Sequence, residues 1–454
     1  MDFRDKKVIV LGAGISGFAV AKLAKQFGAK VILSDAKEEN QIKYNLNELR
    51  VNGIEVLLGK QEEKLLDNLD YLIVSPGVPI GIPLIQKAKE KGIEVMSEIE
   101  VAYRLCDVPM YAITGTNGKT TTTTLLGELM KTLYKTVGVG GNIGTPLCDE
   151  AVRVGHEGCI VAEISSYQLE GIVEFNPQIV AILNVTPDHL ARHGSLENYQ
   201  KVKETIFVRH TKNNFLVLNY DDQIVRDMAN RANSAIMFFS RLEELEEGAF
   251  VKDGWLIIVW KGQTYRVCEV EKVKIKGGHN VENILAAIAV AFLAGVDIAD
   301  MADVLMKFPG VEHRIEPVTT IQGVTYYNDS KATNPESAIK ALETFTGNII
   351  LIAGGHDKNT DLTEFMKLAK VKVDELILIG NASARFKEAA LANGIDCIKI
   401  HEMGYSMEDA VSLAYRLARF PQVVLLSPAC ASFDMFDGFE ERGRVFKKLV
   451  RDLS

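Results

Sequence analysis

Residues 111–124 read Tyr-Ala-Ile-Thr-Gly-Thr-Asn-Gly-Lys-Thr-Thr-Thr-Thr-Thr, and this stretch decides the fold around it. A short apolar run enters a glycine-rich turn, and Gly118-Lys119-Thr120 then opens a pattern that predicts a helix. A strand, a glycine-rich loop and a helix in this order favour a polyphosphate, because the loop N–H groups and the positive helix end both attract negative charge. In such a loop Lys119 supplies a positive charge, and the Thr120 hydroxyl can bind Mg²⁺.

The match to the general nucleotide-triphosphate signature is incomplete. That signature has a glycine five residues before the Gly-Lys pair, and Ile113 stands at this position. The alternative interpretation is a Gly/Thr-rich turn before a buried helix. The pattern alone favours the phosphate loop over this alternative.

Length and composition limit the class of protein. A chain of 454 residues is too long for one hydrophobic core, so about two to four domains are expected. The net charge of −9 and the lack of a Lys/Arg block argue against nucleic-acid binding and a basic membrane-docking surface. No apolar run reaches bilayer length, and the charged N-terminus is not expected to be a signal peptide. The six scattered cysteines indicate reduced thiols and predict a cytoplasmic location.

The first segment predicts a dinucleotide-type unit. A buried strand at 7–11 leads into a Gly-x-Gly-x-x-Gly turn at 12–17, a helix to about Phe27, and a strand that ends at Asp35. This order is the dinucleotide-binding layout. A later strand at 71–74 precedes a Ser-Pro-Gly turn, and the ligand is expected at the C-terminal ends of these strands.

Two further α/β units are expected, because strand patterns continue to alternate with helix patterns, which implies parallel sheets. Segment 235–268 differs, since its short alternating runs predict a small antiparallel appendage. An apolar helix at 279–294 should return to the main sheet. The expected strands lie near 110–114, 159–163, 179–184 and 215–219 in the second unit and near 323–328, 348–353, 375–379, 395–400 and 423–427 in the third.

The predicted fold is therefore α/β with three domains and mostly parallel sheets. Residues 1–97 form an N-terminal Rossmann-like domain, 98–309 a central phosphate-loop mononucleotide-binding domain, and 310–454 a C-terminal Rossmann-like domain. The turn at 308–310, Phe-Pro-Gly, marks the second junction.

Several polar residues follow the apolar strands of the central unit. Glu163 ends one strand, where it suits either a second Mg²⁺ contact or a helix cap. His189 follows another strand beside Asp188, which points towards a site, although a lone histidine is usually structural. Lys203 lies on a helix rich in Lys and Glu, and composition alone predicts a solvated face for it. Asn280 and its neighbour three residues on share one helix face, as caps or as base-reading amides.

The third unit carries three polar loops after strands. Residues 328–334, Asn-Asp-Ser-Lys-Ala-Thr-Asn, combine an acid, a base, hydroxyls and amides, a density that favours a site. The loops at 354–358 and 426–432 also follow strands, so all three can meet at one sheet edge.

Together these motifs resemble the Mur ligase family of peptidoglycan synthesis, from Val8 to Gly443. Gly-Thr-Asn-Gly-Lys-Thr, Asn-Val-Thr-x-Asp-His and Gly-x-His-Asn are typical of the whole family. The loops at 328–334 and 427–436 are similar to those of the member that adds D-glutamate. The N-terminal Gly-x-Gly-x-x-Gly unit argues against the two later ligases of the series.

The resemblance implies an ATP-dependent, amide-forming ligase of cell-wall biogenesis, with the associated roles in cell shape and division. Its substrates would be UDP-N-acetylmuramoyl-L-alanine, D-glutamate and ATP, and a monomer without membrane insertion is expected. The cofactors would be Mg²⁺ at two sites, with a carbamylated Lys203. This modification replaces the solvated-face interpretation of Lys203, and only the resemblance implies it.

The resemblance also implies roles for individual residues. Catalysis would involve Lys119, His189 and Lys203. The metal ligands would be Thr120, Glu163, His189 and Lys203. ATP would contact Gly115, Thr116, Asn117, Gly118, Lys119, Thr120, Thr121, Asn280, Asn283, Arg314, Asp329 and Lys331. The UDP substrate would contact Ile15, Ser16, Ser75, Gly77 and Asn142, and D-glutamate would contact Thr333, Lys358, Ser432 and Phe439.

Three alternatives remain at this point. A folate-type polyglutamate ligase would share the central loop but lack the N-terminal unit. A nicotinamide-dependent dehydrogenase would use the glycine turn at 12–17 and Asp35, which suits an NAD ribose, but it needs no Gly-Lys-Thr loop. A non-catalytic nucleotide-binding regulator would not need the polar loops of the third unit.

Overall fold

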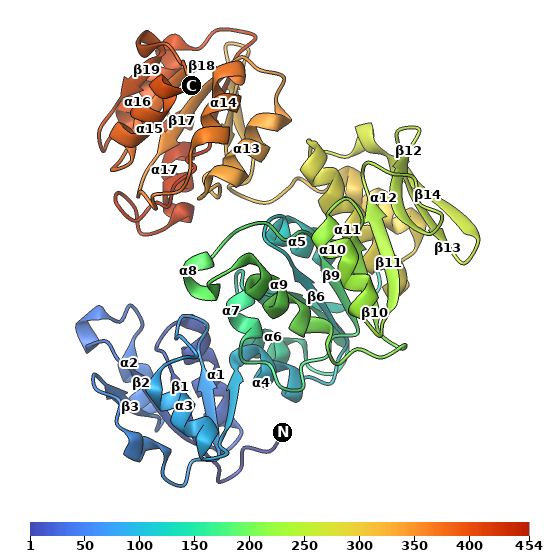
Figure 1. Cartoon of the computed structure of the whole chain (residues 1–454), viewed down its shortest axis with the longest axis vertical. Helices are drawn as coiled ribbons and strands as arrows, with labels where there is room; N and C mark the ends of the chain where they lie inside the picture. Colours follow the sequence, from blue (N-terminus) through green and yellow to red (C-terminus); the bar gives the residue numbers. More distant parts are fainter. Residues whose placement is uncertain (454) are drawn as a thin grey trace. The chain divides into compact units, whose positions relative to one another are not determined.

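The computed structural model describes residues 1–453, which form three sheets with helices between the strands (Figure 1). The chain divides into two compact units. The first comprises Met1–Lys274 and Asn280–Phe308, and the second comprises Ile275–His279 and the chain from Pro309 onward. The predicted α/β class with mostly parallel sheets is confirmed. The predicted limits of three separate domains stay predictions.

The first sheet has five parallel strands in the order β3-β2-β1-β4-β5. Because the chain leaves β1 for β2 on one side and β4 lies on the other, a ligand crevice is expected at the C-terminal end of β1. The strands are β1 (Lys7–Leu11), β2 (Lys30–Asp35), β3 (Glu55–Leu58), β4 (Tyr71–Val74) and β5 (Glu94–Ser97), and the helices are α1 (Ile15–Gln26), α2 (Leu46–Val51) and α3 (Pro83–Glu90).

Gly17 lets α1 start close against the end of β1. A Cβ atom at this position would lie 1.9 Å from the carbonyl oxygen of Gly12, so any larger residue would push the helix away. The third glycine of the motif therefore has a packing role, and it keeps the N-terminal N–H groups of α1 at the crevice.

The central sheet has nine strands in the order β14-β13-β12-β11-β10-β9-β6-β8-β7. The strands are β6 (Met110–Thr114), β7 (Thr136–Gly141), β8 (Gly158–Glu163), β9 (Ile179–Ile182), β10 (Phe215–Asn219), β11 (Ala235–Ser240), β12 (Gly248–Lys252), β13 (Trp255–Trp260) and β14 (Gln263–Glu269). The helices are α4 (Glu98–Leu105), α5 (Lys119–Met130), α6 (Leu147–Val154), α7 (Ser166–Leu169), α8 (Leu190–His193), α9 (Leu196–Glu204), α10 (Gln223–Asp227), α11 (Gly278–Ala294) and α12 (Ile298–Lys307).

The predicted appendage at 235–268 is wrong in part. Strand β11 pairs in parallel with β10, and β12 pairs in parallel with β11, so both continue the main sheet. Only β12, β13 and β14 pair antiparallel. The short turns around Asp253 and Gly262 predicted the hairpins correctly, but they carry no information about how β11 joins β10.

The third sheet has six strands in the order β15-β16-β20-β17-β18-β19, and all pairs except β15 with β16 are parallel. The strands are β15 (Glu316–Ile321), β16 (Val324–Asn328), β17 (Ile349–Gly354), β18 (Val373–Ile379), β19 (Ile400–Glu402) and β20 (Val423–Leu426). The helices are α13 (Pro335–Thr344), α14 (Thr363–Lys372), α15 (Ser383–Ala392), α16 (Met407–Leu417) and α17 (Phe439–Arg451).

Two strand predictions for this sheet are wrong. The expected strand at 395–400 is a 3₁₀ turn, Cys397–Lys399, followed by the short β19. The expected strands of this unit also omit β15, an antiparallel edge strand without fully buried residues. Edge strands of this kind lack the continuous apolar run that predicts a buried parallel strand.

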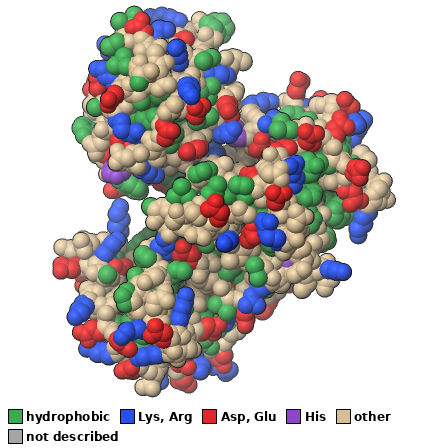
Figure 2. All heavy atoms as spheres, viewed as in Figure 1, with side chains coloured by type: hydrophobic (Ala, Val, Ile, Leu, Met, Phe, Trp, Pro, Cys, Tyr) green, Lys and Arg blue, Asp and Glu red, His purple; other side chains and the backbone are tan. Residues whose placement is uncertain are grey.

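The surface agrees with the mixed composition. On the face shown in Figure 2, Lys and Arg side chains alternate with Asp and Glu, without a broad area of one sign. Within residues 1–453, no helix combines the length and the apolar character needed to cross a membrane.

Glu98 joins the start of α4 to the start of α6. Its Oε1 accepts a hydrogen bond of 2.7 Å from the N–H of Cys148, in the first turn of α6, where backbone donors otherwise lack partners. The residue is 1% exposed, and its Oε2 has no hydrogen-bond partner in the described part of the chain. Burial therefore raises the pKa of Glu98 to about 7.

The substitution Glu98→Gln is expected to stabilise the protein above pH 7 and to change little at pH 5. The pKa of Glu98 in the folded state lies above its ordinary value of 4.5, so its contribution to stability falls as the pH rises between these values. Glutamine keeps an acceptor for the Cys148 N–H without the buried charge. Above pH 7 we expect a gain in unfolding free energy on the order of 2 kcal/mol. Thermal unfolding at pH 5 and pH 8 measures it, and an equal shift at both pH values would contradict the explanation.

Candidate active site

The phosphate loop connects β6 to α5, as the sequence predicts. Gly118 has a φ of 86°, and a Cβ atom there would lie 2.2 Å from Oδ1 of Asn283, so backbone and space both require glycine. The Lys119 ammonium donates to the carbonyl oxygens of Gly115 at 3.0 Å and Thr116 at 2.8 Å. The lysine thus lies over the loop, where a bound phosphate would meet it.

Asn184 holds the loop in shape, a role that the sequence analysis missed. Its Oδ1 accepts hydrogen bonds from the N–H groups of Thr116 at 3.1 Å and Asn117 at 2.8 Å, and its Nδ2 donates to the Asn117 carbonyl at 3.1 Å. In the sequence, Asn184 is the first residue of the Asn-Val-Thr-x-Asp-His motif that leads to His189. The loop is therefore preformed by a side chain that follows β9.

Asn280 and Asn283 lie beside this loop. Helix α11 begins at Gly278, so both residues lie inside its first turns, and both are buried. Asn283 donates to Oδ1 of Asn280 at 3.2 Å and accepts from the Thr122 hydroxyl of α5 at 3.3 Å. The two predicted nucleotide-binding amides and the phosphate loop are thus brought together.

Glu163 ends β8 next to the loop strand, because Glu163 pairs with Ile113 of β6. The residue is 1% exposed. Its Oε1 accepts a hydrogen bond of 2.8 Å from Asn142 Nδ2, and its Oε2 is buried without a hydrogen-bond partner among residues 1–453. A buried carboxylate oxygen without a donor is costly unless a cation or water meets it, and such oxygens are the ligands that Mg²⁺ prefers. Glu163 therefore fits a metal site, with the half-buried Thr120 at the start of α5.

Lys203 is buried, so the solvated-face prediction made from composition is wrong. The residue is 1% exposed, and its Nζ donates to the Gly115 carbonyl at 2.9 Å, the same oxygen that Lys119 contacts. Its Nζ also lies 4.6 Å from the centroid of the Tyr199 ring. Burial, and next the charge of Lys119, hold the pKa of Lys203 well below its usual range.

A series of rings connects His189 to Lys203. His189 has a left-handed backbone with φ 53°, and its Nδ1 lies 3.1 Å from the Tyr167 hydroxyl. Ring centroids are 5.0 Å apart for Tyr167 and His189, 5.8 Å for Tyr167 and His193, and 5.2 Å for His193 and Tyr199. The predicted residues His189 and Lys203 are thus connected by one series of ring contacts. The rings between them were missed, because aromatic residues scattered along a sequence usually indicate core.

The predicted UDP-substrate residues line one cavity of about 750 Å³. Asn142 joins this cavity to Glu163 through the hydrogen bond given above. Asp35 also lines it, but its two oxygens accept hydrogen bonds from the N–H groups of Ala13 at 2.7 Å and Lys37 at 2.9 Å, so it shapes the glycine turn. The residues that the prediction places on this wall are Ile15, Ser16, Ser75, Gly77 and Asn142.

The polar loops of the compact unit that continues from Pro309 follow the C-terminal ends of β16, β17 and β20, which are neighbours in the third sheet. Asp329 is 3% exposed, and its oxygens accept from the Ser427 hydroxyl at 2.8 Å and the Ile315 N–H at 3.2 Å. Burial raises the pKa of Asp329 to about 7, while the charge of Arg314 opposes this rise. The Lys331 ammonium lies 5.4 Å from the centroid of the Phe439 ring. These three predicted nucleotide contacts, Arg314, Asp329 and Lys331, therefore lie within one loop region.

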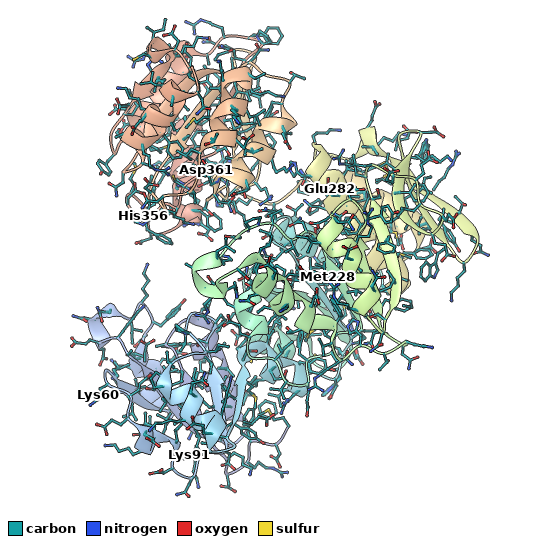
Figure 3. All side chains as sticks on the ribbon, in the orientation of Figure 1. Lys60, Lys91, Met228, Glu282, His356 and Asp361 are labelled. Atoms are coloured by element: carbon teal, nitrogen blue, oxygen red, sulfur yellow. The ribbon has the colours of Figure 1, made fainter. Side chains whose placement is uncertain are left out.

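Three of the predicted D-glutamate residues, Thr333, Lys358 and Ser432, follow the same strand ends, and the fourth, Phe439, begins α17. Lys358 Nζ donates to the Thr333 carbonyl at 3.4 Å, and Ser432 is buried. Figure 3 labels two exposed residues near Lys358. They are His356, which lies two residues before it, and Asp361. The side chain of Arg442 in α17 donates to the Ser330 and Ala431 carbonyls at 2.7 and 3.1 Å, which holds two of the loops together.

One acidic cluster near these loops does not suit a metal ion. Glu312, His313 and Glu316 have side-chain atoms close enough to share a cation. However, the Lys447 ammonium already forms ion pairs with both glutamates, at 2.9 Å for Glu316. A second cation would have to displace it.

Three family models match the chain in order. The Mur ligase MurD-like N-terminal domain matches residues 6–97, the Mur ligase middle domain matches 113–291, and the Mur ligase glutamate ligase domain matches 313–430. Two curated relatives are named UDP-N-acetylmuramoylalanine–D-glutamate ligase. The protein from Thermoanaerobacter sp. (strain X514) is 46% identical and that from Clostridioides difficile (strain 630) is 42% identical, and both matches cover 100% of each chain. The chain belongs to the Mur ligase family.

The same Mur ligase fold is present in distant solved structures. UDP-N-acetylmuramate-alanine ligase MurC from Thermotoga maritima has a TM-score of 0.59 and 21% identity, covering 99% of this chain and 100% of its own. The pseudomurein peptide ligase type C from Methanothermus fervidus has a TM-score of 0.60 and 20% identity over 99% and 100% of the two chains. At these identities the comparison shows the fold alone.

Proposed function

We propose that this Mur ligase joins D-glutamate to UDP-N-acetylmuramoyl-L-alanine at the expense of ATP, in peptidoglycan synthesis. Mur ligases as a family use ATP and Mg²⁺. The observation that carries the proposal is the position of Asn142, which lines the cavity of the first sheet and also binds Glu163 beside the phosphate loop. A ligand held in that cavity would have one end next to the site of phosphoryl transfer. The names of the full-length relatives support the same reaction.

The reaction has two steps. A carboxylate oxygen of the UDP substrate attacks the γ-phosphorus of ATP, the bond to the bridging oxygen breaks, and ADP leaves with an acyl phosphate formed. The amine nitrogen of D-glutamate then attacks the acyl carbon, the amine loses a proton, and inorganic phosphate leaves. In the first step Lys119 would stabilise negative charge on the transferring group, since it already lies over the loop.

The other predicted site residues would bind the metal ions, ATP and D-glutamate. Mg²⁺ would neutralise phosphate oxygens, held at one site by Thr120 and Glu163 and at a second by His189 and Lys203. The loop residues 115–121 and the amides Asn280 and Asn283 would bind ATP, and Arg314, Asp329 and Lys331 stay predicted nucleotide contacts. Thr333, Lys358, Ser432 and Phe439 would bind D-glutamate, and the Lys358 ammonium suits one of its carboxylates.

Lys203 would serve as a carbamate. Its amine nitrogen would add to CO₂ and lose a proton, which replaces a cation by an anionic oxygen ligand. Two observations support this. The amine is buried beside Lys119, where a second positive charge is unfavourable, and the low pKa favours the neutral amine that reacts with CO₂.

The cavity of the first sheet should bind a uridine nucleotide rather than NADH. The glycine turn at 12–17 suits either ligand, but Asn142 and Gln168 of the central region close part of the wall, which fits a ligand that extends towards Glu163. Calorimetric titrations with UDP-N-acetylmuramoyl-L-alanine and with NADH measure this. Saturable NADH binding without binding of the UDP ligand would disprove the assignment.

Release of phosphate from ATP tests the proposed reaction. We expect phosphate and the dipeptide product to form together only when UDP-N-acetylmuramoyl-L-alanine and D-glutamate are both present. Replacing D-glutamate with L-glutamate, or the UDP substrate with a folate, gives the matched controls. Turnover with the folate, or none with the complete mixture, would reject the proposal.

A further inference from the structure

Arg192 connects the wall of the UDP-substrate cavity to the residues around His189. Arg192 lies in α8, and its Nη2 donates a hydrogen bond of 3.0 Å to the carbonyl oxygen of Val78, 114 positions earlier in the chain. Val78 lines the cavity, directly after the turn that contains Ser75 and Gly77. The backbone of this turn is therefore tied to the central region by one guanidinium.

Glu170 fixes the orientation of that guanidinium. Two parallel contacts join the pair, from Nε to Oε1 at 3.2 Å and from Nη2 to Oε2 at 2.5 Å. The side chains are 18% and 7% exposed, so both charges are largely removed from water. A two-point pair of this kind restrains geometry, and loss of either partner leaves the other charge buried.

The same guanidinium also packs on the support of His189. Its central carbon lies 5.1 Å from the centroid of the Tyr167 ring, and the Tyr167 hydroxyl lies 3.1 Å from Nδ1 of His189. The Arg192 N–H donates to the His189 carbonyl at 2.9 Å. His189 has a left-handed backbone, which a residue other than glycine keeps only when its neighbours hold it there.

We infer that Arg192 is a positioning residue that fixes the bound UDP substrate relative to His189. This inference rests on the proposed function. The substrate cavity and the His189 turn are both held by one side chain, so a change in Arg192 would alter the position of the substrate carboxylate relative to the γ-phosphate of ATP. A displacement of about 1 Å in such a geometry can lower the rate about 10²-fold.

The test compares Arg192→Lys with Arg226→Lys. Lysine keeps the charge but cannot form the two parallel bonds or stack as a plane. Arg226 is a matched control, because its guanidinium lies 4.7 Å from the Tyr220 ring centroid and the residue does not line the cavity. For Arg192→Lys we expect kcat/KM for the UDP substrate to fall by about 10- to 10²-fold, with the KM for ATP within about twofold of wild type. Arg226→Lys should match wild type, and Glu170→Gln should reproduce the Arg192→Lys pattern.

Calorimetry with UDP alone gives a second readout that needs no turnover. We expect weaker UDP binding by Arg192→Lys in a protein that still unfolds cooperatively. Wild-type kinetics and wild-type UDP affinity in this variant would overturn the inference. So would an equal rise in all three KM values with a lower melting temperature, which would indicate a general structural role. If the wild-type protein shows no ligation at all, the proposed function fails, and UDP affinity still decides whether Arg192 shapes the cavity.

Discussion

Lys203→Arg is expected to lower kcat by about 10²- to 10³-fold, the largest effect of any single substitution proposed for this chain. Lys203 is buried, and its amine shares the Gly115 carbonyl with Lys119. Arginine stays charged and cannot form a carbamate. It would therefore place a permanent cation beside Lys119 where the proposal requires an anionic oxygen.

Lys201→Arg is the matched control for this change. Lys201 lies on the same helix, two residues earlier, and is exposed, so its replacement should leave the rate unchanged. Removal of CO₂ and bicarbonate from the buffer should lower the activity of the wild-type protein, and added bicarbonate should restore it. A fully active Lys203→Arg protein would show that Lys203 needs no modification.

Lys119→Ala is expected to lower kcat by about 10²-fold or more with little change in thermal stability. The lysine donates hydrogen bonds to two loop carbonyls, and it is half-buried rather than part of the core. Its loss therefore opens no core cavity but removes the positive charge that would meet the transferring phosphoryl group.

Lys131→Ala provides the comparison, because Lys131 directly follows the same helix and is exposed beside Glu128. Initial rates at saturating substrates and melting curves for both variants measure the effect. A rate close to wild type for Lys119→Ala would refute the role of this lysine. A large fall in melting temperature would assign the loss of activity to unfolding instead.

The sequence predicted those parts of the fold that depend on local pattern. Three segments lie where they were expected: the loop after Thr114, the glycine turn at 12–17 and the apolar helix at 279–294. In each case turn residues stand next to a strand or helix with a clear apolar pattern. The edge strands β3 and β15 were missed. Neither contains a fully buried residue, and β15 also lacks an apolar run. Parallel pairing of β11 with β10 depends on contacts distant in sequence, which no local pattern contains.

In the candidate site, too, the sequence predicted what depends on local pattern and missed what depends on contacts distant in sequence. Polar residues at strand ends, such as Glu163, were found because parallel strands bring their C-terminal ends to one edge. The burial of Lys203 was contrary to composition, since one buried lysine on a helix of exposed charges leaves almost no pattern. Asn184 and Arg192 act on backbone groups of distant loops, and Arg192 reaches Val78 across 114 positions. Only the folded structure shows such contacts.

Transfer of oxygen from the substrate carboxylate to phosphate tests the central claim most directly. UDP-N-acetylmuramoyl-L-alanine with ¹⁸O at both oxygens of its terminal carboxylate would be incubated with ATP, D-glutamate and the protein, and the released phosphate analysed by mass spectrometry. Attack of the carboxylate on the γ-phosphorus predicts one ¹⁸O atom in each phosphate and one in each amide product. Phosphate without ¹⁸O would show that ATP is hydrolysed by water or that the carboxylate is activated in another way, and it would contradict the proposed acyl-phosphate mechanism.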